Sequence, residues 1–272
     1  SISGGSYTAA YYGLFGDRIF QDFETRFLKR DAQGEIGRLV FSPVNLMRLT
    51  SPYFGRVDLV AEHLDEEIFE HKTFADLLAA AQTGRRPYIA INATDMSLGS
   101  QFEFTQDQFD LLCSDLSSFS VARAVAASSA VPLWFSPLTL KNYAGQCNYA
   151  EPEWITAALK KREAEPRRFN RAAEIHSYFD ASMRPYIHLL DGGVSDNTGL
   201  RGPMDAAMTA GGANKLAKMS NLDHYNKVVY LLVNAQVRDD FRLDQSEAVP
   251  GISEALWAST RIIDRYSTES II

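Results

Sequence analysis

The chain opens on Ser1-Ile2-Ser3-Gly4-Gly5-Ser6, a stretch of the form small–x–Ser–x–Gly. A helical pattern follows it directly, as expected when a nucleophilic serine sits on a turn from a strand into a helix. The backbone of such a turn is strained, so the residues two positions to either side of the serine are expected to be small. Ser1 stands where the common G-x-S-x-G pattern has glycine, which keeps the position small but departs from the pattern.

Ser3 is the candidate nucleophile of this turn. It lies at the start of the helical pattern, where the helix dipole and free backbone N–H groups favour negative charge. The N–H of Gly4 is therefore the expected donor to an oxyanion. Taken alone, the same stretch also fits an ordinary helix N-cap.

A second candidate site is Asp191-Gly192-Gly193, which follows an apolar run at 186–190. Reacting groups of open α/β sheets gather at the carboxyl ends of strands. An aspartate there can accept a proton from a serine, and glycines allow another backbone to approach closely. A plain strand-to-loop turn is the alternative, because Asp-Gly is a common turn signal.

The wider pattern predicts an α/β protein. Short β-prone runs at 88–93, 100–105, 186–190 and 227–234 alternate with helical patterns at 4–30, 35–80, 119–130, 200–217 and 252–265. This alternation predicts a three-layer α/β/α fold with a mostly parallel central sheet. The run at 227–234 is the most apolar and predicts a buried strand. Residues 141–182 are polar and predict an excursion of loops and surface helices.

Composition excludes several classes of protein. The 272 residues carry 27 Lys plus Arg and 34 Asp plus Glu, a formal net charge of −7, so nucleic acid is not an expected partner. No apolar run is long enough to predict a membrane-spanning helix. Cys113 and Cys147 have no metal-binding spacing and are expected to be two reduced thiols. Neither a metal nor a cofactor is expected.

Four stretches, in this order along residues 1–200, resemble the patatin-like phospholipase family. They are Ser3-Gly4-Gly5-Ser6, Tyr88-Ile89-Ala90-Ile91-Asn92-Ala93-Thr94-Asp95, Val125-Ala126-Ala127-Ser128-Ser129-Ala130-Val131-Pro132, and Asp191-Gly192-Gly193-Val194 followed by Asp196-Asn197. The first resembles the family's nucleophile elbow and the second the strand and loop after it. The third resembles the segment A-[ST]-S-A-x-P, and the fourth the D-G-[GA] aspartate motif.

The resemblance implies a serine acyl hydrolase that cleaves lipid acyl esters, of phospholipids or acylglycerols, through an acyl-enzyme. Its catalytic pair would be a Ser–Asp dyad without histidine, with Ser3 as nucleophile, Asp191 as base and Gly4 as oxyanion donor. The expected supporting residues are Gly5, Gly192, Gly193 and Asn197. The expected partners are a lipid ester substrate and, transiently, a membrane surface.

The family also has a D-G-G-G-x-R-G loop upstream of the elbow, and no such stretch stands before Ser1. We therefore expect residues 1–272 to form one patatin-like catalytic domain, with its first strand and oxyanion loop upstream of residue 1 and 141–182 as a surface insertion. The alternative function is a catalytically silent lipid-binding or interaction domain on the same scaffold.

Other assignments of the candidate residues are weaker. Ser3, Asp191 and His224 follow the order Ser…Asp…His of α/β-hydrolase triads, but His224 precedes the last expected strand rather than following it. Ser1 as an N-terminal nucleophile would suit stacked antiparallel sheets, which the alternation of strands and helices disfavours. Ser128 and Ser129 fit tight helix packing.

An apolar rim for an acyl chain is expected at Val131, Leu133, Trp134 and Phe135. Packing of these side chains in the core is the alternative.

Overall fold

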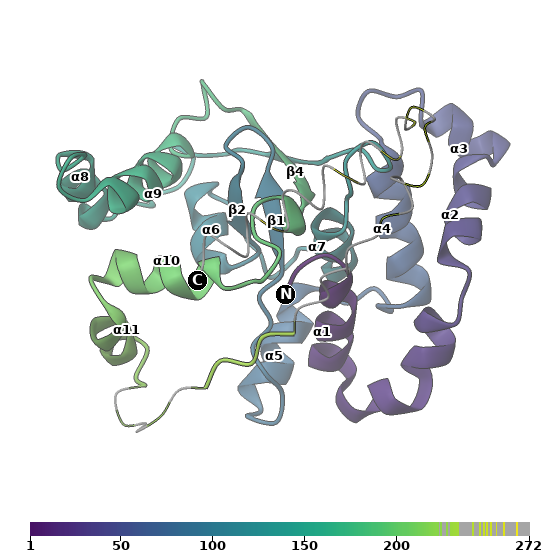
Figure 1. The fold of residues 1–272 in the computed structure, drawn as a ribbon, viewed down its shortest axis with the longest axis horizontal. Helices are drawn as coiled ribbons and strands as arrows, with labels where there is room; N and C mark the ends of the chain where they lie inside the picture. Colours follow the sequence, from purple (N-terminus) through teal and green to yellow (C-terminus); the bar gives the residue numbers. More distant parts are fainter. Residues whose placement is uncertain are drawn as a thin grey trace. The chain divides into compact units, whose positions relative to one another are not determined.

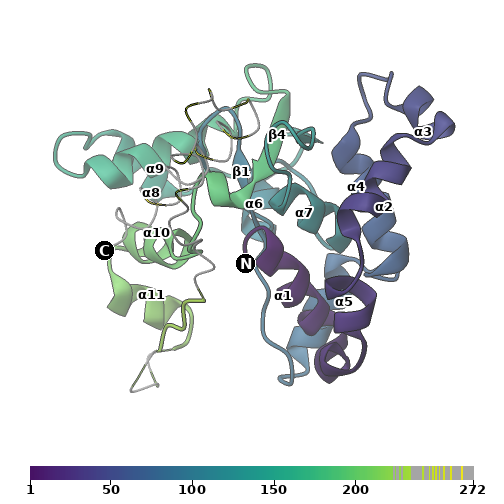
Figure 2. The same ribbon diagram turned by 45° about the vertical axis from the view of Figure 1, so that its right-hand side comes forward.

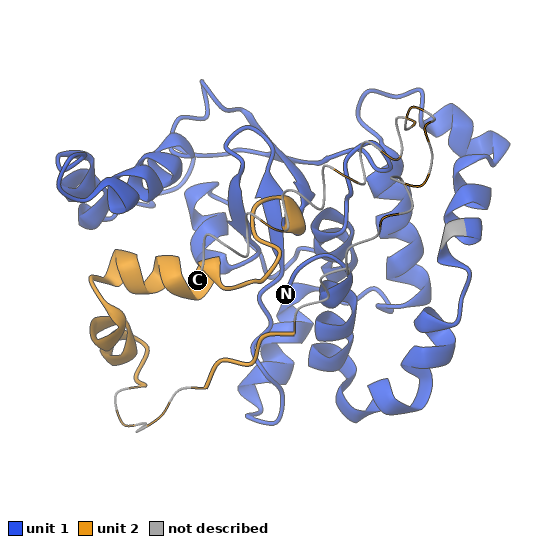
Figure 3. Cartoon of the chain, viewed as in Figure 1, with its two compact units in different colours: residues 1–192 blue, residues 193–272 orange. Residues whose placement is uncertain are grey.

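The computed structural model describes residues 1–222, except for the side chain of Gln33, and positions 224, 227, 229–233, 241, 245, 247, 249, 251, 254, 258 and 265. The chain divides into two compact units, Ser1–Gly192 and Gly193–Ile272, which are described separately (Figure 3). The expectation of one domain over 1–272 stays a prediction.

The first unit combines helices with a small sheet (Figure 1). Its helices are α1 (Gly4–Phe15), η1 (Gly16–Arg18), η2 (Ile19–Leu28), α2 (Ala32–Val40), α3 (Pro43–Arg48), α4 (Arg56–Glu67), α5 (Phe74–Gln82), α6 (Gln106–Leu111), α7 (Val121–Ser128), α8 (Glu153–Leu159) and α9 (Pro166–Ser177). Its strands are β1 (Asn92–Asp95), β2 (Ser100–Glu103), β3 (Leu138–Lys141) and β4 (Tyr186–Asp191).

The four strands form one sheet in the order β2-β1-β4-β3, and each neighbouring pair is antiparallel. β1 and β2 face each other as a hairpin, since the residues between them are too few for the crossover that parallel strands need. The single parallel pairing among the described residues joins Ile2 to Asn92. The chain combines helices with strands as expected, but the mostly parallel sheet of the predicted three-layer fold is not confirmed.

The strand predictions hold unevenly. The runs at 100–105 and 186–190 correspond to β2 and β4, whereas the run at 88–93 becomes a strand only from Asn92. β3 was not expected, since its four residues alternate buried and exposed positions over too short a run to stand out.

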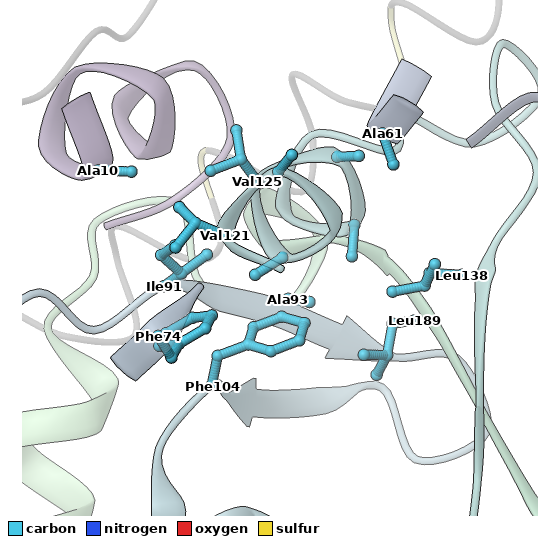
Figure 4. Packing of buried hydrophobic residues seen from close by; sticks show 14 of the residues in the cluster. Ala10, Ala61, Phe74, Ile91, Ala93, Phe104, Val121, Val125, Leu138 and Leu189 are labelled. Atoms are coloured by element: carbon cyan, nitrogen blue, oxygen red, sulfur yellow. The ribbon is translucent and has the colours of Figure 1, made fainter. Parts of the chain in front are cut away.

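Helix α7 forms the centre of the core (Figure 4). Its small side chains, among them Val121 and Val125, are fully buried, and the helix lies between strand β1 and the helices α1 and α4. Small residues allow this close approach on several sides at once. In both views of the ribbon, α4 lies between α7 and the α2–α3 pair (Figure 2).

Beside the sheet, phenylalanine rings pack edge to face and stacked. Phe102 and Phe104 of the β2 region contact each other and Phe109, and Phe104 also stacks on Phe119. Such arrangements suit the quadrupoles of aromatic rings and bury a large apolar area. This cluster fixes the β1–β2 hairpin against α6 and α7.

A buried polar network attaches the excursion at 142–185 to the sheet. Asp95, at the end of β1, is fully buried and accepts hydrogen bonds from the Tyr178 hydroxyl at 2.7 Å and from the Arg184 guanidinium. Burial, and then the charge of Asp95, raises the pKa of Tyr178 well above 10. The side-chain amide of Asn142 bonds to the carbonyls of Tyr178 and Arg184. The excursion is thus anchored, with α8 and α9 packed on each other.

The two cysteines are joined rather than reduced. Cys113, just after α6, forms a disulfide with Cys147 in the excursion, with a Cα–Cα distance of 5.5 Å and a sequence separation of 34 residues. The expectation of two free thiols is therefore wrong. Sequence spacing gave no indication of the pair, because the fold alone brings the segments after α6 and after β3 together.

The second unit contains η3 (Gly192–Val194, at the boundary), α10 (Arg201–Ala210) and α11 (Ala213–Met219). The helix expected at 200–217 is broken at Gly211, whose φ of 87° is favourable only for glycine. In the expected strand at 227–234, residues 227 and 229–233 lie in no strand, and Leu231 is 90 % exposed, so these residues form no buried strand. Positions 228 and 234 and most of 252–265 lie outside the described residues.

Candidate active site

Ser3 lies on a turn between an extended segment and a helix. Ile2 pairs in parallel with Asn92, and the N–H of Asn92 donates to the carbonyl of Ser1 at 2.9 Å. Helix α1 begins at Gly4, directly after Ser3. The backbone of Ser3 has φ 46° and ψ −130°, a conformation that residues other than glycine rarely adopt. The strain expected at a nucleophile elbow is therefore present at this serine.

Asp191 is the last residue of β4 and faces that serine. The Ser3 hydroxyl donates to Asp191 Oδ2 at 2.9 Å. Two hydrogen bonds hold the backbone of Asp191. Its N–H donates to the Ala130 carbonyl at 3.0 Å, and its carbonyl accepts from the Thr94 hydroxyl at 2.8 Å. Two residues 188 positions apart are thus brought into direct contact, as the sequence led us to expect.

The N–H of Gly4 is available to a ligand. Around it, the N–H of Gly5 donates to the Ile2 carbonyl and that of Ser6 to the Ser3 carbonyl, each at 2.9 Å. Among the described residues, the Gly4 N–H has no acceptor, and Gly4 itself is exposed. It belongs to the first turn of α1, where the dipole favours an anion.

The supporting glycines differ in what they do. A Cβ on Gly192 would lie 2.4 Å from the carbonyl oxygen of Asn92, so this position requires glycine for a close backbone approach. A Cβ on Gly5 would meet nothing within 4 Å outside its own helix backbone, so the crowding expected two residues after the nucleophile is not found. Gly193 and Asn197 belong to the second unit, which is described separately.

Ser128 holds the turn at Ser3, a role that its interpretation as helix packing missed. Its buried hydroxyl donates to the Asn92 carbonyl at 2.6 Å and accepts the N–H of Ser3 at 3.0 Å. Because its one proton goes to that carbonyl, the Ser6 hydroxyl at 2.8 Å must be the donor in their contact. The signal in the sequence was the Ser-Ser pair of the third motif.

Tyr7 lies beside the same aspartate. The Ser129 hydroxyl donates to the carbonyl of Val125 at 2.8 Å, so Tyr7 donates its own proton to Ser129 at 3.0 Å. Burial, with a smaller contribution from the charge of Asp191, raises the pKa of Tyr7 above 10. Tyr7 is therefore a neutral hydroxyl at neutral pH.

The histidines of the first unit do not contribute to the Ser3–Asp191 pair. Each contacts another partner. His63 contacts Glu35, His71 contacts Asp65, His176 contacts Glu151, and His188 contacts Thr139. His224 belongs to the second unit, so its suggested place in a triad stays an untested alternative. Within the described residues, no group of three or more His, Cys, Asp or Glu side chains could hold a metal ion.

The expected apolar rim begins directly after the residue that binds the aspartate backbone. Ala130 accepts the N–H of Asp191, and the loop 131–135 follows it. Leu133 and Trp134 are 64 % and 53 % exposed, whereas Phe135 packs against the core. Core packing therefore explains Phe135 but not the other two side chains.

A cavity of about 540 Å³ lies elsewhere in the first unit, beside the disulfide and strand β3. Cys113, Lys141 and Tyr143 are among its lining residues, and neither Ser3 nor Asp191 is. Of the described helices, none is long and apolar enough to cross a membrane.

A strained serine on a strand-to-helix turn, in contact with an aspartate that ends a neighbouring strand, defines the class of α/β hydrolase-like proteins. The family model described as patatin-like phospholipase matches residues 1–204 of the 272, three quarters of the chain. The chain belongs to the patatin-like phospholipase family, and membership indicates lipid acyl hydrolase activity in general terms. Comparison with curated proteins and with solved structures gives no significant match.

Proposed function

We propose that this protein is a serine hydrolase that cleaves acyl esters of phospholipids or acylglycerols with a Ser3–Asp191 dyad. The observation that carries the proposal is the 2.9 Å hydrogen bond from the Ser3 hydroxyl to Asp191, made at a strained strand-to-helix turn. Family membership supports the substrate class. The active site as proposed needs neither a metal nor a cofactor.

The dyad works by moving one proton. As the Ser3 oxygen attacks the ester carbonyl carbon, its proton passes to Asp191 along the existing hydrogen bond. The tetrahedral intermediate collapses when the C–O bond to the alcohol breaks, and Asp191 gives the proton to the departing alcohol oxygen. A water molecule then attacks the acyl-Ser3 ester, again losing its proton to Asp191, and Ser3 regains a proton as the fatty acid leaves.

The developing oxyanion is stabilised by the Gly4 N–H, which has no acceptor among the described residues. A preorganised backbone donor contributes about 10²–10³ in rate when it is aimed at the oxyanion. The dipole of α1, whose first residue is Gly4, adds to the same effect. Since the Ser3 N–H is engaged by Ser128, it is not part of this oxyanion site.

A serine-reactive fluorophosphonate probe tests the nucleophile. We expect the wild-type chain to become labelled on Ser3, and Ser3→Ala to abolish both labelling and hydrolysis of a short-chain p-nitrophenyl ester. The loss should be at least about 10³-fold, the scale seen when a serine nucleophile is removed. Asp191→Asn preserves shape but not basicity, so its rate should fall by about 10²–10⁴-fold.

Ser118→Ala is the matched control, because Ser118 is exposed and lies on the loop before α7, away from the turn. It should be labelled and hydrolyse ester as the wild type does. Labelling that persists in Ser3→Ala would exclude Ser3 as the nucleophile. A folded wild-type chain that is neither labelled nor active, yet binds lipid, would favour the silent lipid-binding domain instead.

A further inference from the structure

Large apolar side chains are exposed on the segment from the end of α2 to the start of α4. Phe41, Val44 and Met47 lie on or beside α3, and Met47 is 72 % exposed. Tyr53, in the loop before α4, is 93 % exposed. Side chains of this size are seldom left in water together on a monomer unless the surface binds something.

A second exposed apolar segment, the loop 131–135, meets the first one. The Arg56 guanidinium donates to the carbonyl of Leu133 at 2.8 Å, and the N–H of Val57 donates to the Ser136 hydroxyl at 3.2 Å. These bonds hold the loop with Leu133 and Trp134 at the N-terminal end of α4. The segment carrying Tyr53 enters α4 at the same place, so the two exposed segments lie next to each other there. We treat them together as one face.

The charge of this face is opposite to that of the whole chain. The chain has 34 acidic residues in 272, about one in eight, and a net charge of −7. Residues 36–57 contain no Asp or Glu but three arginines, Arg38, Arg48 and Arg56. Residues 116–150, which include the loop 131–135, also lack acidic residues.

Two acidic residues of α4, close in sequence to Arg56, are engaged by partners. Glu62 is ion-paired with Arg48, and Asp58 accepts the N–H of Gly55 while lying 3.5 Å from Arg123. Arg38 is exposed and has no ion pair within the described part of the chain. The face is therefore basic as well as apolar.

This face also approaches the proposed dyad. The loop 131–135 leaves directly from Ala130, whose carbonyl binds the N–H of Asp191 at 3.0 Å. A lipid surface that contacts Leu133 and Trp134 would thus lie only a few residues along the chain from Ala130, the residue that binds the proposed base. Proximity of this kind is what a hydrolase that draws its substrate from a lipid surface requires.

We propose that Phe41, Val44, Met47, Tyr53, Leu133 and Trp134, together with Arg38 and Arg56, form a docking face for an anionic phospholipid bilayer. The proposal rests on the proposed function, which makes lipid the substrate. Apolar and aromatic side chains enter the boundary between headgroups and acyl chains, and arginines contact the anionic headgroups. The binding is peripheral and reversible, since no helix of the face is long enough to span.

Sedimentation with vesicles tests the face without relying on catalysis. Ser3→Ala protein is used throughout, so that no lipid is consumed. The vesicles are pure phosphatidylcholine or an equal mixture of phosphatidylcholine and phosphatidylglycerol. The variant Met47→Ser/Tyr53→Ser is compared with the matched pair Met183→Ser/Tyr186→Ser, also an exposed methionine and tyrosine but at the start of β4. Circular dichroism checks that every variant is folded.

We expect tighter binding to the mixed vesicles than to pure phosphatidylcholine, and weaker binding as salt is raised. Met47→Ser/Tyr53→Ser should lose at least about tenfold in affinity through lost apolar burial. Arg38→Gln should lose about fivefold on mixed vesicles only, the contribution of one arginine near an anionic surface. The Met183/Tyr186 pair should bind as the parent does.

Equal binding to both vesicle types, or an equal loss in the matched pair, would overturn the docking face. Hydrolysis of a soluble short-chain ester is measured in parallel with wild-type protein, in which Ser3 is intact. If that reaction is present but the vesicle results contradict the face, only the docking proposal fails. If the reaction and fluorophosphonate labelling are both absent, the proposed function fails, whatever the vesicles show.

Discussion

At the scale of single residues, the nucleophile turn depends on Ser128. Its hydroxyl connects the Ser3 N–H to the Asn92 carbonyl, and it is fully buried. Ser128→Ala removes both bonds and leaves buried polar groups without this partner. Such a loss costs about 1–3 kcal/mol. The Ser3 N–H keeps its 3.2 Å bond to the Ser128 carbonyl, so the turn is loosened rather than freed. Since a loosened turn aims Ser3 less accurately, kcat should fall by about tenfold, with little change in KM.

Steady-state kinetics on a soluble ester measure this effect, and Ser6→Ala is the control. Ser6 is also fully buried and contacts the Ser128 hydroxyl, but it is not bonded through its side chain to the Ser3 N–H. Ser6→Ala should lower the stability of the protein but reduce kcat less than Ser128→Ala does. Equal losses in kcat for the two variants would mean that Ser128 contributes only to packing.

A second residue-scale prediction concerns the glycines of the site. Gly192→Ala places a methyl group 2.4 Å from the Asn92 carbonyl oxygen, and backbone cannot move aside cheaply. We expect a loss of about 1–3 kcal/mol in the free energy of unfolding, measured by denaturant titration. Gly5→Ala, in open space within α1, should be neutral or stabilise by up to about 1 kcal/mol. A neutral Gly192→Ala would show that the sheet yields at this point.

Sequence patterns predicted the two residues of the proposed dyad from local features. The small residues around Ser3 and the helical pattern that follows are visible in six residues. The strained backbone at Ser3 was observed, whereas the crowding expected at Gly5 was not. The Ser-Ser pair of the third motif drew attention to Ser128 but did not reveal its hydrogen bonds, because its three partners come from residues 3, 6 and 92. A contact of that range leaves no periodicity or spacing in the chain.

At the scale of elements, the sheet differs from expectation because alternation along the chain does not determine strand direction. β1 and β2 are a hairpin, so they must be antiparallel. β3 and β4 are connected by the long excursion, which is anchored at Asp95 and returns the chain between β3 and β1, antiparallel to both. Apolar runs predicted β2 and β4 well, whereas the short β3 required the fold to define it.

The disulfide gives the element-scale prediction. It closes a loop of 34 residues, from the end of α6 to the excursion beyond β3. By loop-closure entropy, such a link stabilises by about 2–4 kcal/mol. The variant Cys113→Ser/Cys147→Ser should therefore lose about that much in the free energy of unfolding, measured in guanidinium.

Reduction of the wild-type chain should reproduce the loss and leave the double variant unchanged, which separates the bond from the substitutions. Fluorophosphonate labelling at 25 °C should be unaffected, because neither Ser3 nor Asp191 contacts the two cysteines. Wild-type stability that does not respond to reductant would mean that the link adds nothing to the folded state.

At the scale of the whole molecule, both partners of the proposed dyad and the proposed docking face belong to the first unit, residues 1–192. The core of that unit is arranged around α7, whose C-terminal Ser128 reaches the nucleophile turn and whose following loop carries Leu133 and Trp134. Core packing, the proposed catalysis and the proposed lipid contact would therefore all depend on one continuous segment, 121–135. Global unfolding of this unit should abolish all three together.

That unit should lose stability in alkaline solution. Burial raises the pKa of Tyr178 well above 10, helped by the charge of Asp95, and raises that of Tyr7 above 10 as well. A tyrosine whose pKa is raised by folding keeps its proton in the native state while the unfolded chain releases it. Its contribution is complete below pH 10 and is lost as pH rises through the native-state pKa.

Above pH 10, each of these tyrosines should lower the free energy of unfolding by up to about 1.4 kcal/mol per pH unit, as long as the unfolded chain is ionised there and the native state is not. Denaturant titrations at several pH values measure that slope. Tyr7→Phe and Tyr178→Phe should each reduce this slope by the contribution of one tyrosine, whatever they do to stability at neutral pH. Tyr53→Phe, at a position 93 % exposed, should leave the slope unchanged. A slope unaltered in both buried variants would show that these hydroxyls ionise as readily in the folded protein as in the unfolded chain.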